Sequence, residues 1–312
     1  MKFFKTIEDN ILAAPPLKGS RLKTLYPSSA SCRDIDNPEI VHGGCLRATW
    51  YRLSGYSESD PSGAYSQYIF AAGKMWEEWI IEQCKLGGFF VMNNLKFSIP
   101  EYYLSGEIDI AIKDPSTDEI IIVESKTYSS GNYQAKAEYA GIGGRVPMPK
   151  HQNVMQAALY LHHFSNPENG GIKRVLLTYF DRACGGPENN REFWVTLRPE
   201  GDRTYIHIDT EDIKGVHHSY DMPGITLDGV FERYQEQIEA AKNYKDNPPP
   251  PDYQHVYSKE KVIRLWDAGE IAKTKYEKWA RNPEANPIGD WQCAYCNYKT
   301  ICKQQKEEQG YT

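Results

Sequence analysis

Two acidic stretches next to apolar runs have the side chains needed to bind a divalent cation. Residues 120–123 read IIIV and lead directly into Glu124, Ser125 and Lys126, while Asp109 stands upstream in the stretch GEIDI. Side chains alternate along a strand, so Glu124 and Lys126 share one face and Ser125 points to the other. Carboxylates on adjacent strands suit Mg²⁺ or Mn²⁺, and a nearby lysine can orient water or stabilise charge on a phosphate. The pattern therefore predicts phosphodiester hydrolysis.

The same residues also have a simpler interpretation. A Glu-x-Lys pair at the end of a strand is often a surface ion pair, and such pairs add little stability. Here, however, the apolar run before the pair shows no alternation, which is typical of a strand covered on both faces. Two charges on such a strand are costly unless they meet partners or an ion. The surroundings of the pair therefore favour a site over a solvent-exposed contact.

Helices and strands are predicted on both sides of these residues. Apolar side chains follow helical spacing from about residue 64, and this pattern ends at Gly87 and Gly88. Turn-forming residues in DPSTDE connect two of the extended segments that follow. The sequence predicts strands at 89–100, 104–114, 119–128, 172–182 and 191–210, and helices at 150–164 and on both sides of the proline run at 247–251.

These elements predict a mixed α/β fold in three parts. Residues 1–63 form a loop-rich N-terminal segment that ends in a short helix, residues 64–222 a core of mixed helices and strands, and residues 223–312 a helical C-terminal region. The length of 312 residues is enough for a sizeable hydrophobic core. The content of 40% hydrophobic and 25% charged residues is typical of globular proteins.

The charge and the apolar runs limit the classes of partner. A net charge of −6 argues against a protein covered in basic residues for indiscriminate nucleic-acid binding, although it allows a local basic groove. No apolar run approaches the ~20 residues of a membrane span, and the first residues lack the apolar region of a signal peptide. We therefore expect a cytoplasmic protein without a membrane partner.

The cysteines suggest a second site, for a metal. Three of the seven, Cys293, Cys296 and Cys302, lie close together near the C-terminus beside aromatic residues. In a cytosolic chain such clustering favours metal ligation over disulfides. Three thiolates can hold zinc or an iron–sulfur cluster, and both usually take a fourth ligand. That ligand must come from a distant part of the sequence, where Cys32 and Cys45 are the candidates.

The order of the acidic motifs resembles the PD-(D/E)XK nuclease superfamily, and specifically its RecB-like exonuclease branch. In that branch a helix carries the first metal-binding residue, a Gly-x-x-Asp strand the second, and an Asp/Glu-x-Lys strand the third together with a lysine. A following helix carries Gln-x-x-x-Tyr. Here the corresponding segments are GKMWEEW, GEID, VESK and QAALY, within roughly residues 64–165. The resemblance implies a restriction-endonuclease-like mixed sheet flanked by helices.

The resemblance also implies roles for individual residues. Many members have a histidine where this chain has Glu77, which leaves Glu78 as an alternative; we prefer Glu77 because a carboxylate can still bind the metal. Gln-x-x-x-Tyr contacts DNA beside the active site in the family. The implied ligands of Mg²⁺ or Mn²⁺ are Glu77, Asp109, Glu124 and the Ser125 carbonyl, with Lys126 as the catalytic lysine and Gln156 and Tyr160 as the DNA contacts.

The cysteines carry a second resemblance. Cys45, in GGCLRATWY, resembles the Cys-x-Arg segment of iron–sulfur RecB-like nucleases, which include the CRISPR-associated exonuclease and the AddB nuclease domain. Those proteins hold a [4Fe–4S] cluster with one N-terminal and three C-terminal cysteines, which implies Cys45, Cys293, Cys296 and Cys302. Cys32 stays the alternative fourth ligand and zinc the alternative metal. Such a cluster would join the first and last segments of the chain.

The resemblances together imply a metal-dependent DNA exonuclease that acts on single-stranded DNA or DNA ends, with 5′-to-3′ polarity. Recombination, phage replication and CRISPR adaptation all fit, in a bacterial, archaeal or phage-infected cell. Partners would then be DNA and proteins of recombination or CRISPR adaptation. The alternatives are a non-catalytic DNA-binding adaptor that retains the fold, and a restriction-type endonuclease. The oligomeric state stays open.

Overall fold

The structure is a computed structural model that describes residues 24–129, 131, 138–139, 141, 145–183, 186–244 and 247–308. Its contacts divide the chain into two compact units. The first, here the sheet unit, comprises Met1–Gly44 and Gly63–Glu239; the second, the cysteine unit, comprises Cys45–Ser62 and Ala240–Thr312. A short segment that follows the first 44 residues therefore belongs with the C-terminal part of the chain.

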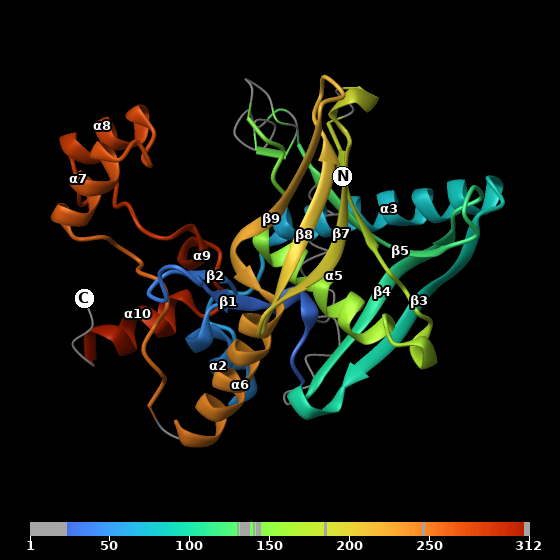
Figure 1. Cartoon of the computed structure of the whole chain (residues 1–312). Helices are drawn as coiled ribbons and strands as arrows, with labels where there is room; N and C mark the ends of the chain where they lie inside the picture. Colours follow the sequence, from blue (N-terminus) through green and yellow to red (C-terminus); the bar gives the residue numbers. More distant parts are fainter. Residues whose placement is uncertain are drawn as a thin grey trace, which may run out of the picture. The chain divides into compact units, whose positions relative to one another are not determined.

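The sheet unit is built on a mixed sheet of seven strands (Figure 1). The strands follow the order β3-β4-β5-β6-β7-β8-β9, and all neighbours are antiparallel except β5 and β6. Helix α5 connects the parallel pair. The strands are β3 (Phe90–Ile99), β4 (Leu104–Lys113), β5 (Ile120–Tyr128), β6 (Val175–Asp181), β7 (Arg191–Glu200), β8 (Arg203–Glu211) and β9 (His217–Thr226).

Helices α3 (Ala64–Leu86) and α5 (His151–Phe164) cover opposite faces of this sheet, as the alternation along β5 shows. Ile121 and Val123 belong to the apolar cluster that includes the buried residues of α3. Glu124, one residue further, accepts a hydrogen bond from Gln156 of α5. The strand is thus covered on both sides, which explains an apolar run without alternation.

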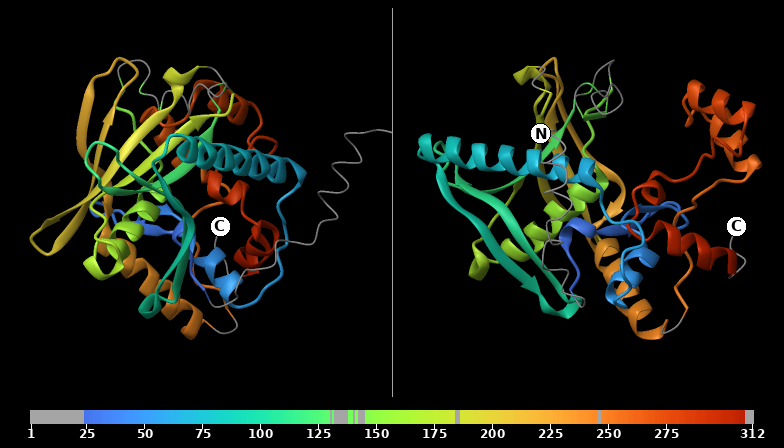
Figure 2. Two further views of the ribbon diagram at one scale, coloured as in Figure 1. Left: turned by 90° about the vertical axis from the view of Figure 1, so that its right-hand side faces the viewer. Right: turned by 180° about the vertical axis from the view of Figure 1, so that it is seen from behind.

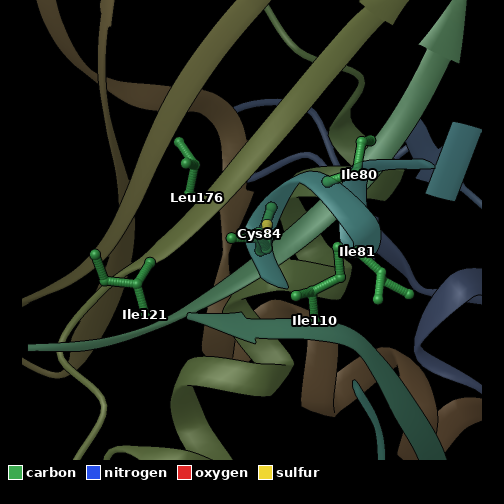
Figure 3. Close-up of a cluster of buried hydrophobic side chains, with 7 residues drawn as sticks. Ile80, Ile81, Cys84, Ile110, Ile121 and Leu176 are labelled. Atoms are coloured by element: carbon green, nitrogen blue, oxygen red, sulfur yellow. The ribbon is translucent and has the colours of Figure 1, made fainter. Parts of the chain in front are cut away.

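The C-terminal third of α3 packs on the strands through a small apolar cluster (Figure 3). Ile80, Ile81 and Cys84 of the helix meet Ile110 of β4 and Ile121 of β5. Burying each isoleucine contributes about 1.5–3 kcal/mol. The cluster fixes α3 close to the acidic residues of β4 and β5. It thereby also positions the charged side chains in the turn of α3 that precedes Ile80.

A second, two-stranded sheet precedes these elements in the chain. Strands β1 (Ser31–Arg33) and β2 (Val41–Gly43) are antiparallel, and β2 ends at a glycine with a left-handed φ of 93°. A Cβ on Gly43 would lie 2.2 Å from the Ala30 carbonyl oxygen, so only glycine fits there. Helix α6 (Leu227–Asn243), orange in Figure 2, follows β9, and the division between the two units falls within it at Glu239/Ala240.

The cysteine unit is helical in its described residues. Its aromatic core contains Trp50, Tyr51 and Tyr298, and the Tyr51 and Tyr298 rings stack with centroids 5.3 Å apart. The helices are α2 (Leu46–Leu53), α7 (Lys259–Asp267), α8 (Lys273–Arg281), α9 (Trp291–Ala294) and α10 (Lys299–Glu308). The chain also forms short 3₁₀ helices at Pro27–Ser29, Pro100–Tyr102, Pro167–Asn169 and Pro187–Asn189.

The structure confirms the mixed α/β sheet and most of the predicted elements. Strand β9 was not predicted, since its alternation is interrupted by Pro223 and Gly224. The helical pattern after the proline run is broken into α7 and α8, where Gly269 has a left-handed φ of 74°. Part of the predicted loop at 139–149 lies outside the described residues. Among the helices that are described, none combines the length and the apolar character needed to cross a membrane.

The two divisions of the chain differ. The units meet at Gly44/Cys45, Ser62/Gly63 and Glu239/Ala240, whereas the sequence suggests boundaries after residues 63 and 222. Both place a boundary just before α3. The other difference arises because β9 extends the sheet to Thr226 and most of α6 belongs with it, so the sheet unit includes 17 more residues than the predicted core at this end: residues 223–239.

Candidate functional site

The antiparallel pairing of β4 with β5 brings Asp109 and Glu124 together. Ile110 lies opposite Val123, so the next residues outward on the two strands are Asp109 and Glu124. The backbone N–H of Ser125 donates to Oδ2 of Asp109 at 3.0 Å. This bond fixes the Asp109 carboxylate against β5. The two carboxylates predicted from separate motifs therefore share one place in the fold.

Glu124 is the most deeply buried charge of the site, with 1% of its surface exposed. Its Oε1 forms an ion pair with Nζ of Lys126 and accepts a hydrogen bond of 2.8 Å from Nε2 of Gln156. Its Oε2 is buried and has no hydrogen-bond partner among the described residues. An unsatisfied carboxylate oxygen in the interior is unfavourable unless a cation or a donor meets it. Glu124 therefore fits a metal ligand.

The charges around Asp109 also favour a bound cation. Burial and the neighbouring charge of Glu124 raise the pKa of Asp109 to about 7, although Lys126 and the Ser125 N–H act in the opposite direction. Burial alone would lower the pKa of Lys126, but the charges of Glu124 and Asp109 outweigh it and raise that pKa. The lysine is thus held in its charged form. A divalent cation would stabilise both carboxylates as anions.

The helix α3 supplies the third carboxylate candidate. Glu77 is half-buried, whereas Glu78 is exposed. Burial raises the pKa of Glu77, and so does the charge of Asp109, which places the two carboxylates within electrostatic range of each other. The charge of Glu77 also acts on Lys126. These observations favour Glu77 over Glu78 as the helix ligand, and the Ser125 carbonyl stays a prediction.

Gln156 and Tyr160 lie behind Glu124 instead of on the surface. Their exposed fractions are 7% and 1%. Besides its bond to Glu124, Nε2 of Gln156 donates to the Tyr160 hydroxyl at 2.6 Å, and that hydroxyl donates to the Glu107 carbonyl at 3.2 Å. The pair therefore links the acidic strands to α5. It holds the Glu124 side chain in place, and little of either residue is open to a DNA strand.

A glycine allows β4 to reach this position. A Cβ on Gly106, three residues before Asp109, would lie 2.6 Å from the Phe97 ring and 2.8 Å from Cγ of Pro27. The Phe97 ring in turn meets the Tyr160 ring edge to face, with centroids 5.5 Å apart. The glycine of the Gly-x-x-Asp motif is therefore required for close packing beside the acidic residues.

The four predicted cluster cysteines all belong to the cysteine unit. Burial raises the pKa of Cys293 to about 12, and the next contributions come from the charges of Cys45, Asp290 and Cys302. Cys296 is within electrostatic range of Cys302. Cys32, the alternative ligand, belongs to the sheet unit, where its thiol lies 4.0 Å from the Thr226 carbonyl oxygen. The structure therefore favours Cys45 over Cys32.

Two buried cations lie near these cysteines, and the motifs of the sequence assign them no role. Arg47 is fully buried; its Nη1 lies 3.9 Å from Sγ of Cys302, and its Nε donates to the Pro249 carbonyl at 2.7 Å. Lys306 is also buried and acts to lower the pKa of Cys293. Buried cations compensate a set of thiolates, and hence an anionic metal centre. The Cys-x-Arg spacing was the only signal for Arg47.

Cys45 has a further feature that suits a metal-bound thiolate. It is the N-cap residue of α2. Burial and the charge of Asp252 raise the pKa of its thiol to about 12, while the backbone N–H groups of Ala48 and Arg47 act to lower it. Amides at a helix N-terminus stabilise an anionic sulfur. The residues therefore fit a metal or a cluster ligated by cysteine.

Neither set of side chains is arranged as a finished metal shell. Across the described ranges, no three His, Cys, Asp or Glu residues are close enough together to hold a metal ion as they stand. The carboxylate site is held instead by the Lys126–Glu124 ion pair, and Cys296 and Cys302 by apolar packing. The fit to a metal rests on the donor types, the unsatisfied Oε2 of Glu124 and the buried cations.

Comparison with known proteins identifies a family. The sequence model of one protein family, the PD-(D/E)XK nuclease superfamily, matches residues 44–303. This range is most of the chain and includes both candidate sites. The seven-stranded mixed sheet with helices on both faces is consistent with the restriction-endonuclease-like fold. No curated protein matches the sequence.

Proposed function

Because this chain belongs to the PD-(D/E)XK nuclease superfamily, we propose that its sheet unit hydrolyses phosphodiester bonds of DNA at the Asp109–Glu124 site. One observation carries the proposal: two carboxylates meet beside a charged lysine, and one buried oxygen of Glu124 has no partner among the described residues. Oxygen ligands of this kind suit Mg²⁺ or Mn²⁺. Asp109, Glu124 and Glu77 would hold the ion, with the Ser125 carbonyl as a further ligand.

The residues around the ion would have different roles in the reaction. A bound divalent cation lowers the pKa of water and offsets charge on the phosphate. Lys126, which the carboxylates keep protonated, places a positive charge where negative charge develops on the attacked phosphate. Gln156 holds Glu124, and Tyr160 holds Gln156, so both act as positioning residues. The charge at the site is thus set by side chains fixed on β5 and α5.

Within the superfamily, we propose the RecB-like exonuclease branch. The order of the helix, the Gly-x-x-Asp strand, the Glu-x-Lys strand and the Gln-x-x-x-Tyr helix supports this assignment. Its substrate would be single-stranded DNA or DNA ends, with 5′-to-3′ polarity by resemblance. The cysteines support the same branch, because four thiols gather in one unit around buried cations. Recombination, phage replication or CRISPR adaptation would supply such substrates.

We further propose that Cys45, Cys293, Cys296 and Cys302 ligate a [4Fe–4S] cluster. The electrostatic proximity of Cys45 to Cys293 supports this set. Because Cys45 precedes α2 and the other three cysteines lie in and around α9 and α10, the cluster would join Cys45–Ser62 to the C-terminal helices. Its role would be structural, since ligands from distant segments cross-link the fold in the way a structural zinc does.

Digestion of end-labelled linear DNA tests the nuclease proposal. We expect Mn²⁺- or Mg²⁺-dependent release of nucleotides from linear DNA and none from closed circles. Asp109→Asn keeps the size of the side chain and its acceptor for Ser125, and Lys126→Ala removes the cation; each should lower the rate on the order of 10²–10³-fold. Lys113→Ala, at the exposed end of β4, is the matched control with an unchanged rate.

Three results would contradict parts of this proposal. Undiminished cleavage by folded Asp109→Asn and Lys126→Ala proteins would exclude this site. Cleavage of closed circles would indicate a restriction-type endonuclease. DNA binding without cleavage in either metal would indicate a DNA-binding adaptor. Thermal melts of each variant separate loss of chemistry from loss of fold, because Lys126→Ala leaves Glu124 without its ion-pair partner.

A further inference from the structure

Helix α8 carries an unusual concentration of positive charge. Among its nine residues, Lys273, Lys275, Lys278 and Arg281 are basic, and Glu277 is the one acidic residue. All four cations are exposed. The whole chain, by contrast, has a net charge of −6. A basic surface on an acidic protein therefore stands out from the average composition.

Within the described residues, these cations take little part in ion pairs. Lys273 approaches Glu277 at 4.0 Å on an exposed surface, which is a weak pair. In the portion of the chain that the structure describes, Lys275, Lys278 and Arg281 form no ion pair. Nor does the helix itself explain the whole set. Basic residues in the last turn suit the helix dipole, but lysines in the first turn oppose it, and no acidic residue lies there.

The helix is held on a small core of its own, which leaves the basic face outside. Val262 of α7 and Trp279 of α8 are buried together with Ile271 and Ile288. The Trp266 and Tyr276 rings stack between the two helices with centroids 4.4 Å apart. The α7–α8 hairpin therefore presents the cations on a rigid element. Replacing the exposed lysines removes charge without opening this core.

We propose that the exposed face of α8 binds the phosphate backbone of a DNA strand. The inference rests on the proposed function for its ligand, since a nuclease meets DNA as its polyanionic substrate. Exposed, unpaired lysines and arginines bind phosphates without reading sequence, which is what an exonuclease requires. Phosphates also supply the external negative charge that the first turn of α8 lacks. The carboxylate site would cut, while α8 adds affinity.

A pair of triple variants tests this surface. One carries Lys275→Gln, Lys278→Gln and Arg281→Gln; the control carries Lys173→Gln, Lys214→Gln and Lys242→Gln, three exposed lysines elsewhere. Both lose the same net charge, so nonspecific electrostatic effects cancel. The full-length protein is titrated in EDTA with a fluorescently labelled single strand, and with the duplex, while salt varies between about 50 and 200 mM.

We expect weaker binding of the α8 variant than of the control, with unchanged melting temperatures for both. The slope of log affinity against log salt should shrink by about 2 on the single strand or about 2.7 on the duplex, since each lost phosphate contact removes about 0.7 or 0.9. Equal affinities and equal slopes for the two variants would overturn the proposal, as would a wild-type protein that binds no DNA.

Binding in EDTA needs no cleavage, so the two proposals can fail separately. A wild-type protein that binds DNA through α8 but cleaves nothing in Mn²⁺ or Mg²⁺ contradicts the nuclease and supports the surface. A wild-type protein that cleaves, while the α8 variant binds and cleaves like the control, contradicts the surface alone.

Discussion

The carboxylate site and the cysteine set solve the same physical problem in different ways. Both bring ionisable groups into buried surroundings, where a lone charge is expensive. In the sheet unit the anions come with an internal cation, Lys126, whose side chain is 27% exposed. In the cysteine unit Cys302 and Cys296 lie among aromatic rings, and the buried Arg47 lies beside Cys302.

This difference separates a site that must exchange ligands from one that must not. A catalytic metal needs an open position for water and substrate, whereas a structural metal is enclosed by its protein ligands. The unsatisfied oxygen of Glu124 and the half-buried Asp109 match the first case. Cys302, which is buried in the aromatic cluster of the cysteine unit, matches the second. Loss of a carboxylate ligand should therefore stop the reaction in the sheet unit. Loss of a cysteine ligand should unfold the cysteine unit.

The largest effect should come from the cysteines. Cys296→Ser removes one proposed ligand, and we expect loss of the cluster and unfolding of the cysteine unit, because a structural metal can contribute on the order of 10 kcal/mol to folding. Iron and sulfide analysis of an anaerobic preparation measures the cluster, and circular dichroism measures the helices. Cys32→Ala, in the sheet unit, is the control; it should keep the brown colour of an iron–sulfur cluster and stay folded.

Other outcomes would change the comparison. A colourless wild-type protein with one zinc would keep the structural role and replace the cluster. If Cys32→Ala loses its iron while Cys45→Ser keeps it, the fourth ligand is Cys32 and not Cys45. A Cys296→Ser protein with full helical content and a normal melting curve would show that the cysteines do not stabilise this unit, and the contrast between the two regions would fail.

A smaller effect, in the sheet unit, distinguishes positioning from DNA contact. Gln156→Leu removes the donor to Glu124, and residues that orient a metal ligand typically contribute 10–100-fold to metal affinity or activity. We expect cleavage to need more Mn²⁺, with unchanged DNA affinity in EDTA. Gln152→Leu is the matched control, because Gln152 is bonded to the Ser28 carbonyl instead.

The opposite pattern would restore the role implied by the resemblance. If Gln156→Leu weakens DNA binding in EDTA and leaves the Mn²⁺ requirement unchanged, the side chain contacts DNA. The 7% exposure of Gln156 and the 1% exposure of Tyr160 make positioning the expected result. Tyr160→Phe should follow Gln156→Leu with a smaller loss, since it removes only the second link of the chain.

The sequence was most informative where chemistry and periodicity coincide. The apolar run before Glu124 predicted a strand covered on both faces, and the turn DPSTDE predicted the pairing that brings Asp109 beside Glu124. The direction of a buried side chain was not predictable in the same way. Whether Gln156 faces DNA or Glu124 depends on how α5 lies on the sheet, which helical spacing alone does not determine.

The same limit applies to contacts between distant segments. The Cys-x2-Cys-x5-Cys spacing indicated a metal site, but it did not show that Arg47, 255 residues before Cys302, lies against that thiol. Strand β9 was missed because Pro223 and Gly224 interrupt its pattern, although the neighbouring strand β8 supplies its partner. Such features follow from tertiary packing, which overrides local propensity.

The smallest effect concerns a half-buried histidine that forms no ion pair with the described residues. His151, at the start of α5, stacks on His42 with ring centroids 4.1 Å apart, and its Nε2 lies 3.1 Å from the Pro223 carbonyl oxygen. Burial, and the neighbouring His42, lower the pKa of His151 to about 4. This histidine therefore avoids the cost of burial by staying neutral, unlike the paired charges of the carboxylate site.

The sign of its pH dependence follows from this shift. The folded-state pKa lies below the unfolded value of about 6.5, so the unfolded chain binds the proton first as pH falls. The contribution of His151 to the free energy of unfolding is complete above pH ~6.5. It is lost progressively as the pH falls toward ~4, by at most about 3 kcal/mol. Urea unfolding of wild type and His151→Gln across this range measures the difference. If the free energy of unfolding depends on pH in the same way for both proteins, the pKa of His151 is not lowered by folding. The contrast between this neutral histidine and the paired charges of the carboxylate site would then fail.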